Sequence, residues 1–302
     1  MSDKLTQPRN NHLSFSLELF PPKTDKGVKN LLRQLPLVED IQPRTVCITS
    51  GAGGTGNNRT LSTIRTIQSH TNIPPTAHLT CVANEKNEIQ DSLNEYAQEG
   101  IYRIVALRGD PNEQDPLPPP TDSYGDAAAL VQGIRNRSDG DLFHISVAGY
   151  PEVHPKAQSR KSDLLNLKRK VDEGADLILT QFFFEPEIYL QFVEATENLT
   201  IDVPIVPGII VISDFPRISR FAAKCGATIP KWITDRFTNF DADSKDTTSL
   251  AKQIAIQQCS KLIENGVRTF HFYTLNQLDL IAGICETLQS EHAPTTEDCT
   301  SS

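Results

Sequence analysis

The chain has 302 residues, 38% of them hydrophobic, and its 29 Lys and Arg against 38 Asp and Glu give a net charge of −9. This length suits one large barrel or two modest domains, and the acidic balance argues against nucleic acid as a partner. The first residues are polar without an apolar signal core, and no apolar run is long enough to span a membrane. The six cysteines form no CxxC pair, so we expect a cytoplasmic protein with reduced thiols, no membrane partner and no metal site.

Eight short apolar segments, each followed by a helical pattern, predict a repeated strand–helix unit. Most of them are apolar on both faces, which is typical of a buried parallel sheet. Eight such units in roughly 280 residues predict an α/β protein with the (β/α)₈ or TIM-barrel fold. We expect one catalytic barrel over residues 13–289 between disordered ends at 1–12 and 290–302. The predicted strands are 14–20, 45–49, 75–80, 103–107, 144–149, 177–181, 204–209 and 269–274.

Two helical segments need separate mention. One is predicted from about Ser162 to Gly174, a glycine suited to the left-handed position after a helix. The other follows from the long interval before the last strand, which must hold extra structure. We expect a turn around Trp232 and a helix over 246–265 there.

Polar residues recur close to the C-terminal ends of the predicted strands. Active sites of (β/α)₈ barrels lie on that face of the sheet, so the pattern predicts a pocket lined from almost every strand. The residues concerned are Glu18, Thr49, His78, Asp110, Tyr150, Gln181, Gly208 and Tyr273.

Glu18 is the strongest single candidate for a catalytic residue. Phe15, Leu17 and Leu19 alternate onto one strand face, so Glu18 faces the barrel interior if the leucines face the helices. A desolvated carboxyl group there has a raised pKa and can act as a general acid. The alternative is a glutamate at the barrel rim, paired with an arginine.

The helix from about Ser162 carries a second candidate site. Beside its apolar stripe, an acid, an amide and two cations recur at helical intervals, and together they could hold a ligand with sugar hydroxyls and phosphates. The alternative is an ordinary solvated, charged face. Two of the strand-end residues could also have purely structural roles, since His78 could be a buried core histidine and Asp110 could cap a turn. The helix residues are Asp163, Asn166, Arg169 and Lys170.

Two loops belong to the predicted active face. GAGGTG at 51–56 matches the dinucleotide pattern GxGxxG, but it lies in the second unit, and no acidic residue occurs between Asp40 and Glu85 to bind a ribose. We interpret it as a glycine-rich loop where backbone can approach a cofactor. The proline-rich loop 111–125 is expected over the pocket mouth. No nucleophile elbow, Walker loop or metal triad is present, which favours chemistry carried by an organic cofactor.

Seven segments occur in an order that resembles a known family: SLELFPPK, ALRGDP, AGYPEVHP, DLLNLKRKVDEGAD, LTQFFF, PGI and HFYTLN. They resemble the catalytic barrel of methylenetetrahydrofolate reductases, closest to the short bacterial form, over about residues 13–289. The resemblance implies a (β/α)₈ barrel with FAD at its C-terminal face and a ping-pong reaction. NADH or NADPH reduces FAD and leaves. Methylenetetrahydrofolate then receives the hydride from flavin N5, and the methyltetrahydrofolate formed supplies methyl groups for methionine synthesis.

The resemblance also implies roles for residues. Glu18 would be the general acid, and Asp110 would lie near the flavin and the pterin. The flavin site would comprise Thr49, Ser50, His78, Arg108, Gly109, Asp110, Tyr124, Tyr150, His154, Ala157, Asp163, Asn166, Arg169 and Lys170. The substrate site would comprise Asp110, Gln181, Phe221, Arg217 and Gln277.

This sequence departs from the family pattern at four places. Ser50 stands where an aromatic residue is common, and Tyr124 matches a loop tyrosine only with a two-residue insertion. Arg217 stands where the family has Gln, and Gln277 where many relatives have Arg. Arg217 is therefore an alternative source of charge for the folate's glutamate tail. A flavin-independent hydride transfer and a non-catalytic folate-binding barrel remain as alternatives, and a homo-oligomer is expected.

Overall fold

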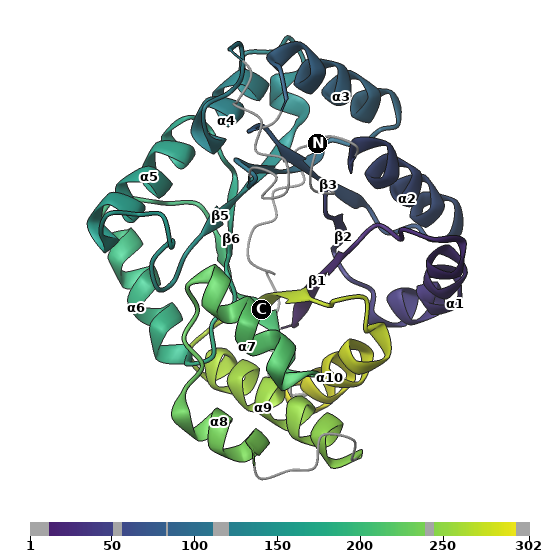
Figure 1. The fold of residues 1–302 in the computed structure, drawn as a ribbon, viewed down its shortest axis with the longest axis vertical. Helices are drawn as coiled ribbons and strands as arrows, with labels where there is room; N and C mark the ends of the chain where they lie inside the picture. Colours follow the sequence, from purple (N-terminus) through teal and green to yellow (C-terminus); the bar gives the residue numbers. More distant parts are fainter. Residues whose placement is uncertain (1–11, 51–55, 83, 111–120, 239–244, 294–302) are drawn as a thin grey trace, which may run out of the picture.

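The computed structural model describes residues 12–50, 56–82, 84–110, 121–238 and 245–293. In these residues, nine parallel strands form one nearly closed barrel, and ten α-helices accompany it (Figure 1). The predicted α/β fold of the (β/α)₈ type is confirmed. Most of the GAGGTG segment, and residues 111–120 of the proline-rich loop, lie outside the described residues.

The strands follow one another around the barrel in the order β7-β6-β5-β4-β3-β2-β1-β9-β8, with every pair parallel. All their C-terminal ends therefore lie at the same mouth of the barrel. The strands are β1 (Ser14–Leu19), β2 (Thr45–Ile48), β3 (Pro75–Thr80), β4 (Arg103–Leu107), β5 (His144–Gly149), β6 (Leu177–Thr180), β7 (Ile205–Val206), β8 (Gly208–Ile210) and β9 (Thr269–Tyr273).

The strand predicted over 204–209 is two short strands. Pro207 separates them because proline has no N–H to donate to a sheet. The first short strand, β7, pairs with β6, and the second, β8, pairs with β9. The Gly208 N–H donates to Thr180 Oγ1 over 2.9 Å, and the Tyr273 hydroxyl donates to Thr180 O over 2.7 Å. Side-chain bonds thus close the barrel where the ladder is interrupted.

The two helices with predicted bounds lie close to their expected positions. The helix expected from about Ser162 starts at Arg160, because Ser159 Oγ accepts a hydrogen bond from the Ser162 N–H and caps it. Gly174 follows it with φ of +108°. The turn expected around Trp232 is a helix. The helices are α1 (Asp25–Ile41), α2 (Gly56–His70), α3 (Lys86–Gln98), α4 (Ala127–Arg135), α5 (Arg160–Asp172), α6 (Pro186–Glu197), α7 (Phe215–Cys225), α8 (Lys231–Thr238), α9 (Lys245–Glu264) and α10 (Leu278–Glu291).

The last helix passes the predicted end of the barrel domain. Residues 278–291 form α10, whereas the domain was expected to end at 289. Of the two ends predicted to be disordered, residues 1–11 and 294–302 lie outside the described part of the chain.

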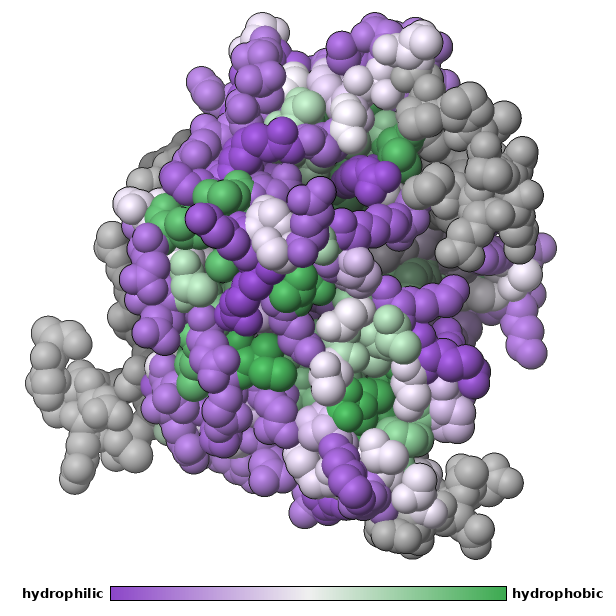
Figure 2. Space-filling view, turned by 60° about the vertical axis from the view of Figure 1, so that its left-hand side comes forward, coloured by the Kyte–Doolittle hydropathy of each residue, from purple (hydrophilic) through white to green (hydrophobic). Residues whose placement is uncertain are grey.

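The core has two parts that match the alternation of the strands. Phe15, Leu17 and Leu19 belong to the large cluster shared with the helices, so Glu18 does face the barrel interior. A smaller cluster fills that interior with Cys47, Val105, Leu177, Leu179 and Val206. The outer face in Figure 2 is mainly hydrophilic, with small separate apolar areas. In the described residues no helix has the length and apolar character needed to cross a membrane.

Candidate active site

Glu18 lies inside the barrel between two histidines. Its Oε2 atom is 3.4 Å from His78 Nε2 and 3.7 Å from His271 Nε2, and its side chain is 14% exposed. Burial raises the pKa of Glu18, but the polar interactions with His271 and His78 outweigh burial and hold the pKa below its ordinary value. The expected raised pKa is therefore wrong, and the carboxylate's neighbours are histidines rather than the alternative arginine.

His271 is a member of this group that the sequence analysis missed. It is fully buried on β9, where its backbone is in register with Ser16. Its Nδ1 atom lies 2.8 Å from Ser16 Oγ, which fixes the ring. The alternation of Thr269, His271 and Tyr273 on a strand beside β1 was the signal that could have revealed it. Burial lowers the pKa of His78 and favours its neutral form, whereas the charge of the Glu18 carboxylate favours its protonated form.

A cavity of about 470 Å³ lies at the C-terminal ends of β4 and β5, beside the start of α5. We call it the upper cavity. It brings together most of the residues predicted to hold the cofactor, from three separate parts of the chain. Those that line it are Arg108, Gly109, Asp110, Tyr150, His154, Ala157, Asp163, Asn166 and Lys170.

The β5–α5 loop is held in place by its own polar side chains. Asp163 Oδ2 accepts a hydrogen bond of 2.9 Å from the His154 N–H, and His154 Nδ1 accepts one of 3.0 Å from the Lys156 N–H. The Tyr150 and His154 rings meet edge to face at 4.5 Å. Burial raises the pKa of Tyr150 to about 12 and lowers that of His154. Both rings are therefore neutral near pH 7.

Lys170 was predicted to line this site, but the burial of its amino group was not expected. Its Nζ atom donates a 2.6 Å hydrogen bond to Ala148 O. Burial lowers the pKa of Lys170 to about 8, although Asp163 and Asp126 raise it. A buried cation of this kind is costly without an anion. Lys170 itself is therefore not part of a solvated helix face, whereas Asn166 and Arg169 are exposed.

Arg169 takes a different direction from its neighbour. It forms an ion pair with Asp126, the N-cap of α4, and its Nη2 donates to Asn166 Oδ1 over 3.2 Å. Asp126 and Asn166 both line the upper cavity. Arg169 therefore supports the rim without lining the cavity itself.

The β4–α4 loop brings backbone close to the cavity. Gly109 has φ of +80°, and a Cβ atom there would lie 2.9 Å from Thr80 Cβ, so a side chain is excluded. The next residue, Asp110, is exposed and forms a 2.8 Å ion pair with Lys156. The loop thus presents backbone and a carboxylate to the same space.

A second cavity, of about 660 Å³, lies at the ends of β1 and β2. Its lining includes Thr49, Ser50 and Arg217 of the predicted site, together with Lys23 and Arg59. None of the described residues that line this cavity is acidic. We call it the cationic cavity.

Two residues predicted to contact the substrate, Phe221 and Gln181, lie beside Phe182 at the end of β6. Phe221 is 39% exposed, and its ring lies 5.4 Å from that of Phe182. Gln181 lines a small hollow with Tyr150 and Phe182, and its Oε1 accepts a 3.0 Å hydrogen bond from the Phe182 N–H. Gln181 follows β6 directly, and Phe221 lies on α7.

Two predicted site residues are placed elsewhere. The Tyr124 hydroxyl accepts a 2.9 Å hydrogen bond from Gln90 Nε2, and its ring packs against Gly133 of α4. Gln277 precedes α10 without capping it through its side chain. Neither residue lines the upper or the cationic cavity. Their assignments stay predictions.

Taken together, these features define a (β/α)₈ barrel with a carboxylate–histidine group in its interior and two cavities with basic side chains at its C-terminal mouth. The profile of the methylenetetrahydrofolate reductase family matches residues 4–289. The chain therefore belongs to the methylenetetrahydrofolate reductase family.

Known relatives agree with this assignment. The chain is 39% identical over 276 residues to 5,10-methylenetetrahydrofolate reductase of Pectobacterium carotovorum, covering 91% of this chain and 90% of the relative. Identity to the Escherichia coli protein of the same name is 39% over 279 residues, with the same two coverages. A probable methylenetetrahydrofolate reductase (NADH) of Oryza sativa is 36% identical, covering 89% of this chain and 47% of the relative.

A solved structure shares the fold. An uncharacterized protein from Clostridium thermocellum, described as binding two copies of 5-methyl-5,6,7,8-tetrahydrofolic acid, superposes with a TM-score of 0.66 at 13% identity. The match covers 93% of this chain and 96% of that one. At this identity the likeness shows a common fold.

Proposed function

We propose that this protein reduces 5,10-methylenetetrahydrofolate to 5-methyltetrahydrofolate, with NADH or NADPH as donor, FAD as carrier and a ping-pong order of substrates. The observation that carries the proposal is the upper cavity. Nine residues predicted for the flavin site, drawn from the β4–α4 loop, the β5–α5 loop and α5, meet around it. Family membership supports the overall reaction, and we infer a cytoplasmic enzyme.

The upper cavity fits part of a dinucleotide cofactor chemically. Lys170 and Arg108 offer cations to a diphosphate, and Asp163 and Asn166 offer partners to sugar hydroxyls. Gly109 lines the same cavity without a side chain. Its volume of about 470 Å³ is within the usual range for ligand pockets. When bound, FAD would accept a hydride from the nicotinamide and later give it to the folate.

Glu18 would supply the proton that the folate needs. Its Oε2 atom faces Nε2 of both His78 and His271, so we propose that the three groups share a proton. The carboxyl group would donate it to a folate ring nitrogen and recover it from the imidazole side. A carboxyl group whose pKa is held low is mostly ionised at neutral pH and seldom carries a proton to donate. A proton passed to Glu18 from His78 or His271 would explain how it could still act as an acid.

The cationic cavity offers a place for the anionic tail of the folate. Arg217, Lys23 and Arg59 line it without an acidic residue among its described lining. This supports Arg217 as the source of the charge that Gln277 does not provide. Phe221, exposed beside Phe182, would stack on the flat part of the substrate, and Gln181 would contact it near Tyr150.

Purification followed by a visible spectrum and a nicotinamide-oxidation assay tests this function. A bound flavin spectrum and oxidation that depends on methylenetetrahydrofolate, with methyltetrahydrofolate as product, are expected. Folate-dependent oxidation by a colourless protein would overturn the flavin assignment. Folate binding without any oxidation would overturn the catalytic one.

A further inference from the structure

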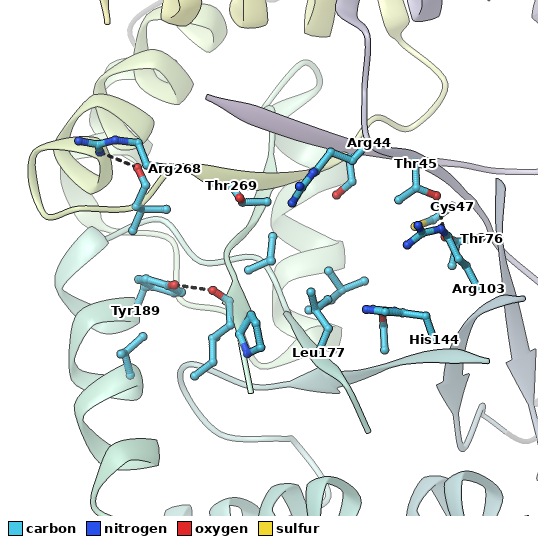
Figure 3. A pocket seen from close by; sticks show the side chains of 18 of the residues that line it. Arg44, Thr45, Cys47, Thr76, Arg103, His144, Leu177, Tyr189, Arg268 and Thr269 are labelled. Atoms are coloured by element: carbon cyan, nitrogen blue, oxygen red, sulfur yellow. Dashed lines mark hydrogen bonds between the residues drawn. The ribbon is translucent and has the colours of Figure 1, made fainter. Parts of the chain in front are cut away.

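Two cations at opposite mouths of the barrel have different partners. At the N-terminal mouth, Arg268 Nη1 donates to the backbone carbonyl of Val267 at 3.0 Å (Figure 3), a local contact that serves the fold. At the C-terminal mouth, Lys156 Nζ instead reaches the carboxylate of Asp110 at 2.8 Å. This ion pair joins the β5–α5 loop to the β4–α4 loop. It therefore links two of the segments that form the upper cavity.

Both members of the ion pair line the upper cavity. The backbone of Lys156 is fixed by its own loop, since its N–H donates to His154 Nδ1 at 3.0 Å. The Lys156 and Asp110 side chains are 53% and 85% exposed, so the pair stabilises the fold very little. A ligand that fills the cavity would take water away from the pair and strengthen the field of both charges. The two charges therefore matter most to the occupant of the cavity.

The charge of Asp110 reaches residues on other elements of the site. Burial raises the pKa of Tyr150, and the charges of Cys225 and Asp110 raise it further. Burial also raises the pKa of Cys225, with the charge of Asp110 as the next cause. Tyr150 is hydrogen-bonded to Gln181, which is predicted to contact the substrate. Asp110 therefore acts on the side of the upper cavity that lies nearest to the predicted substrate residue.

The charge of such a group matters for hydride transfer. A hydride from the nicotinamide brings two electrons and one proton, so the flavin that accepts it gains one negative charge. A carboxylate nearby disfavours that added charge and lowers the reduction potential of the flavin, whereas an ammonium group raises it. With Lys156 Nζ only 2.8 Å from Asp110, the two opposite charges largely cancel at longer distances.

We propose that Lys156 is a positioning residue that sets the reduction potential of the bound flavin, because its ammonium group pairs with Asp110 and offsets the charge of that carboxylate. This inference rests on the proposed function, since it needs flavin in the upper cavity. It adds a residue that tunes the cofactor without taking part in the transfer itself.

Equilibration of the bound flavin with a reference dye of known potential tests the proposal on the purified holoprotein, without turnover. Lys156→Met should shift the equilibrium toward oxidised flavin at least threefold, which is about 14 mV for a two-electron couple. Lys156→Glu should shift it further. Lys156→Arg, which keeps the charge, should stay within twofold of the wild type. Asp110→Asn should shift the equilibrium toward reduced flavin, and Lys156→Met combined with Asp110→Asn should return it to within threefold of the wild type.

Lys231→Met is the matched control, because Lys231 forms a comparable 2.6 Å ion pair with Asp235 on α8 and does not line the upper cavity. Its flavin should keep the wild-type potential, and thermal melts establish that each variant is folded. The proposal is overturned if flavin stays bound and Lys156→Met shifts the equilibrium less than threefold, or if Lys156→Glu shifts it no further than Lys156→Met. A wild-type protein that binds no added FAD would overturn the proposed function, and this inference with it.

Discussion

Replacing the buried amino group of Lys170 should separate the stability of the barrel from its hold on the cofactor. The pKa of Lys170 is lowered from 10.5 to about 8, which means that burial costs its charged form about 3 kcal/mol. Lys170→Met removes that cost. It also leaves Ala148 O without the 2.6 Å bond it now accepts, a loss of about 1–3 kcal/mol. The two nearly cancel, so the apo-protein should keep its stability to within about 1 kcal/mol.

The cofactor should respond differently. If the Lys170 ammonium binds the anionic part of FAD, its removal costs a charge-assisted bond of about 1.5–3 kcal/mol, or roughly 10- to 150-fold in affinity. Flavin fluorescence on dilution measures this release, and circular dichroism melts of the apo-protein measure stability. Arg160→Met, an exposed cation on the same helix, is a control that should release little flavin.

The pH dependence gives a second check on Lys170. The folded chain loses this proton near pH 8, whereas the unfolded chain keeps it until about 10.5. The unfolded state therefore binds more protons in that window, and the stability of the wild-type apo-protein should rise across it relative to Lys170→Met. FAD affinity of the wild type should fall over the same window. The reasoning fails if Lys170→Met keeps flavin as tightly as the wild type, or if its apo-form is destabilised by several kcal/mol.

Three further substitutions test other parts of the site. Glu18→Gln, which is nearly isosteric, should keep flavin and the half-reaction with NAD(P)H within a few-fold but slow folate reduction roughly 10²–10⁴-fold; equal losses in both stopped-flow half-reactions would contradict the role of Glu18. Leu167→Ala, at a side chain only 3% exposed, should cost roughly 2–5 kcal/mol in thermal or denaturant unfolding, and release flavin only as the fold melts. Arg217→Ala should raise KM for a folate with a glutamate tail, with kcat little changed, and adding Gln277→Arg should restore part of the loss; an unchanged KM would remove Arg217 from the substrate site.

The fold was largely predictable because its signals are local. Alternation on β1 placed Glu18 inside the barrel, and Ser159 and Gly174 bound the helix α5 with ordinary capping chemistry. The split at Pro207 was also visible in principle, because a proline cannot donate within a central strand. The resemblance supplied the residues that meet in the upper cavity.

What sequence alone could not give depends on contacts between distant segments. The pKa of Glu18 was expected to be raised because the sequence indicated that its side chain is buried but not which side chains surround it. His271, more than 250 residues away along the chain, reverses that direction. The burial of Lys170 follows from how α5 docks on β5, since the same residue could equally point to solvent.

A single-turnover experiment tests the central claim most directly. The purified protein is reduced without oxygen by NADH, freed of nucleotide and mixed with 5,10-methylenetetrahydrofolate. The proposed reaction predicts that the absorbance of oxidised flavin returns and that one 5-methyltetrahydrofolate forms per bound flavin. Flavin that stays reduced in the presence of the folate, or product that forms only while NADH is still bound, would contradict it.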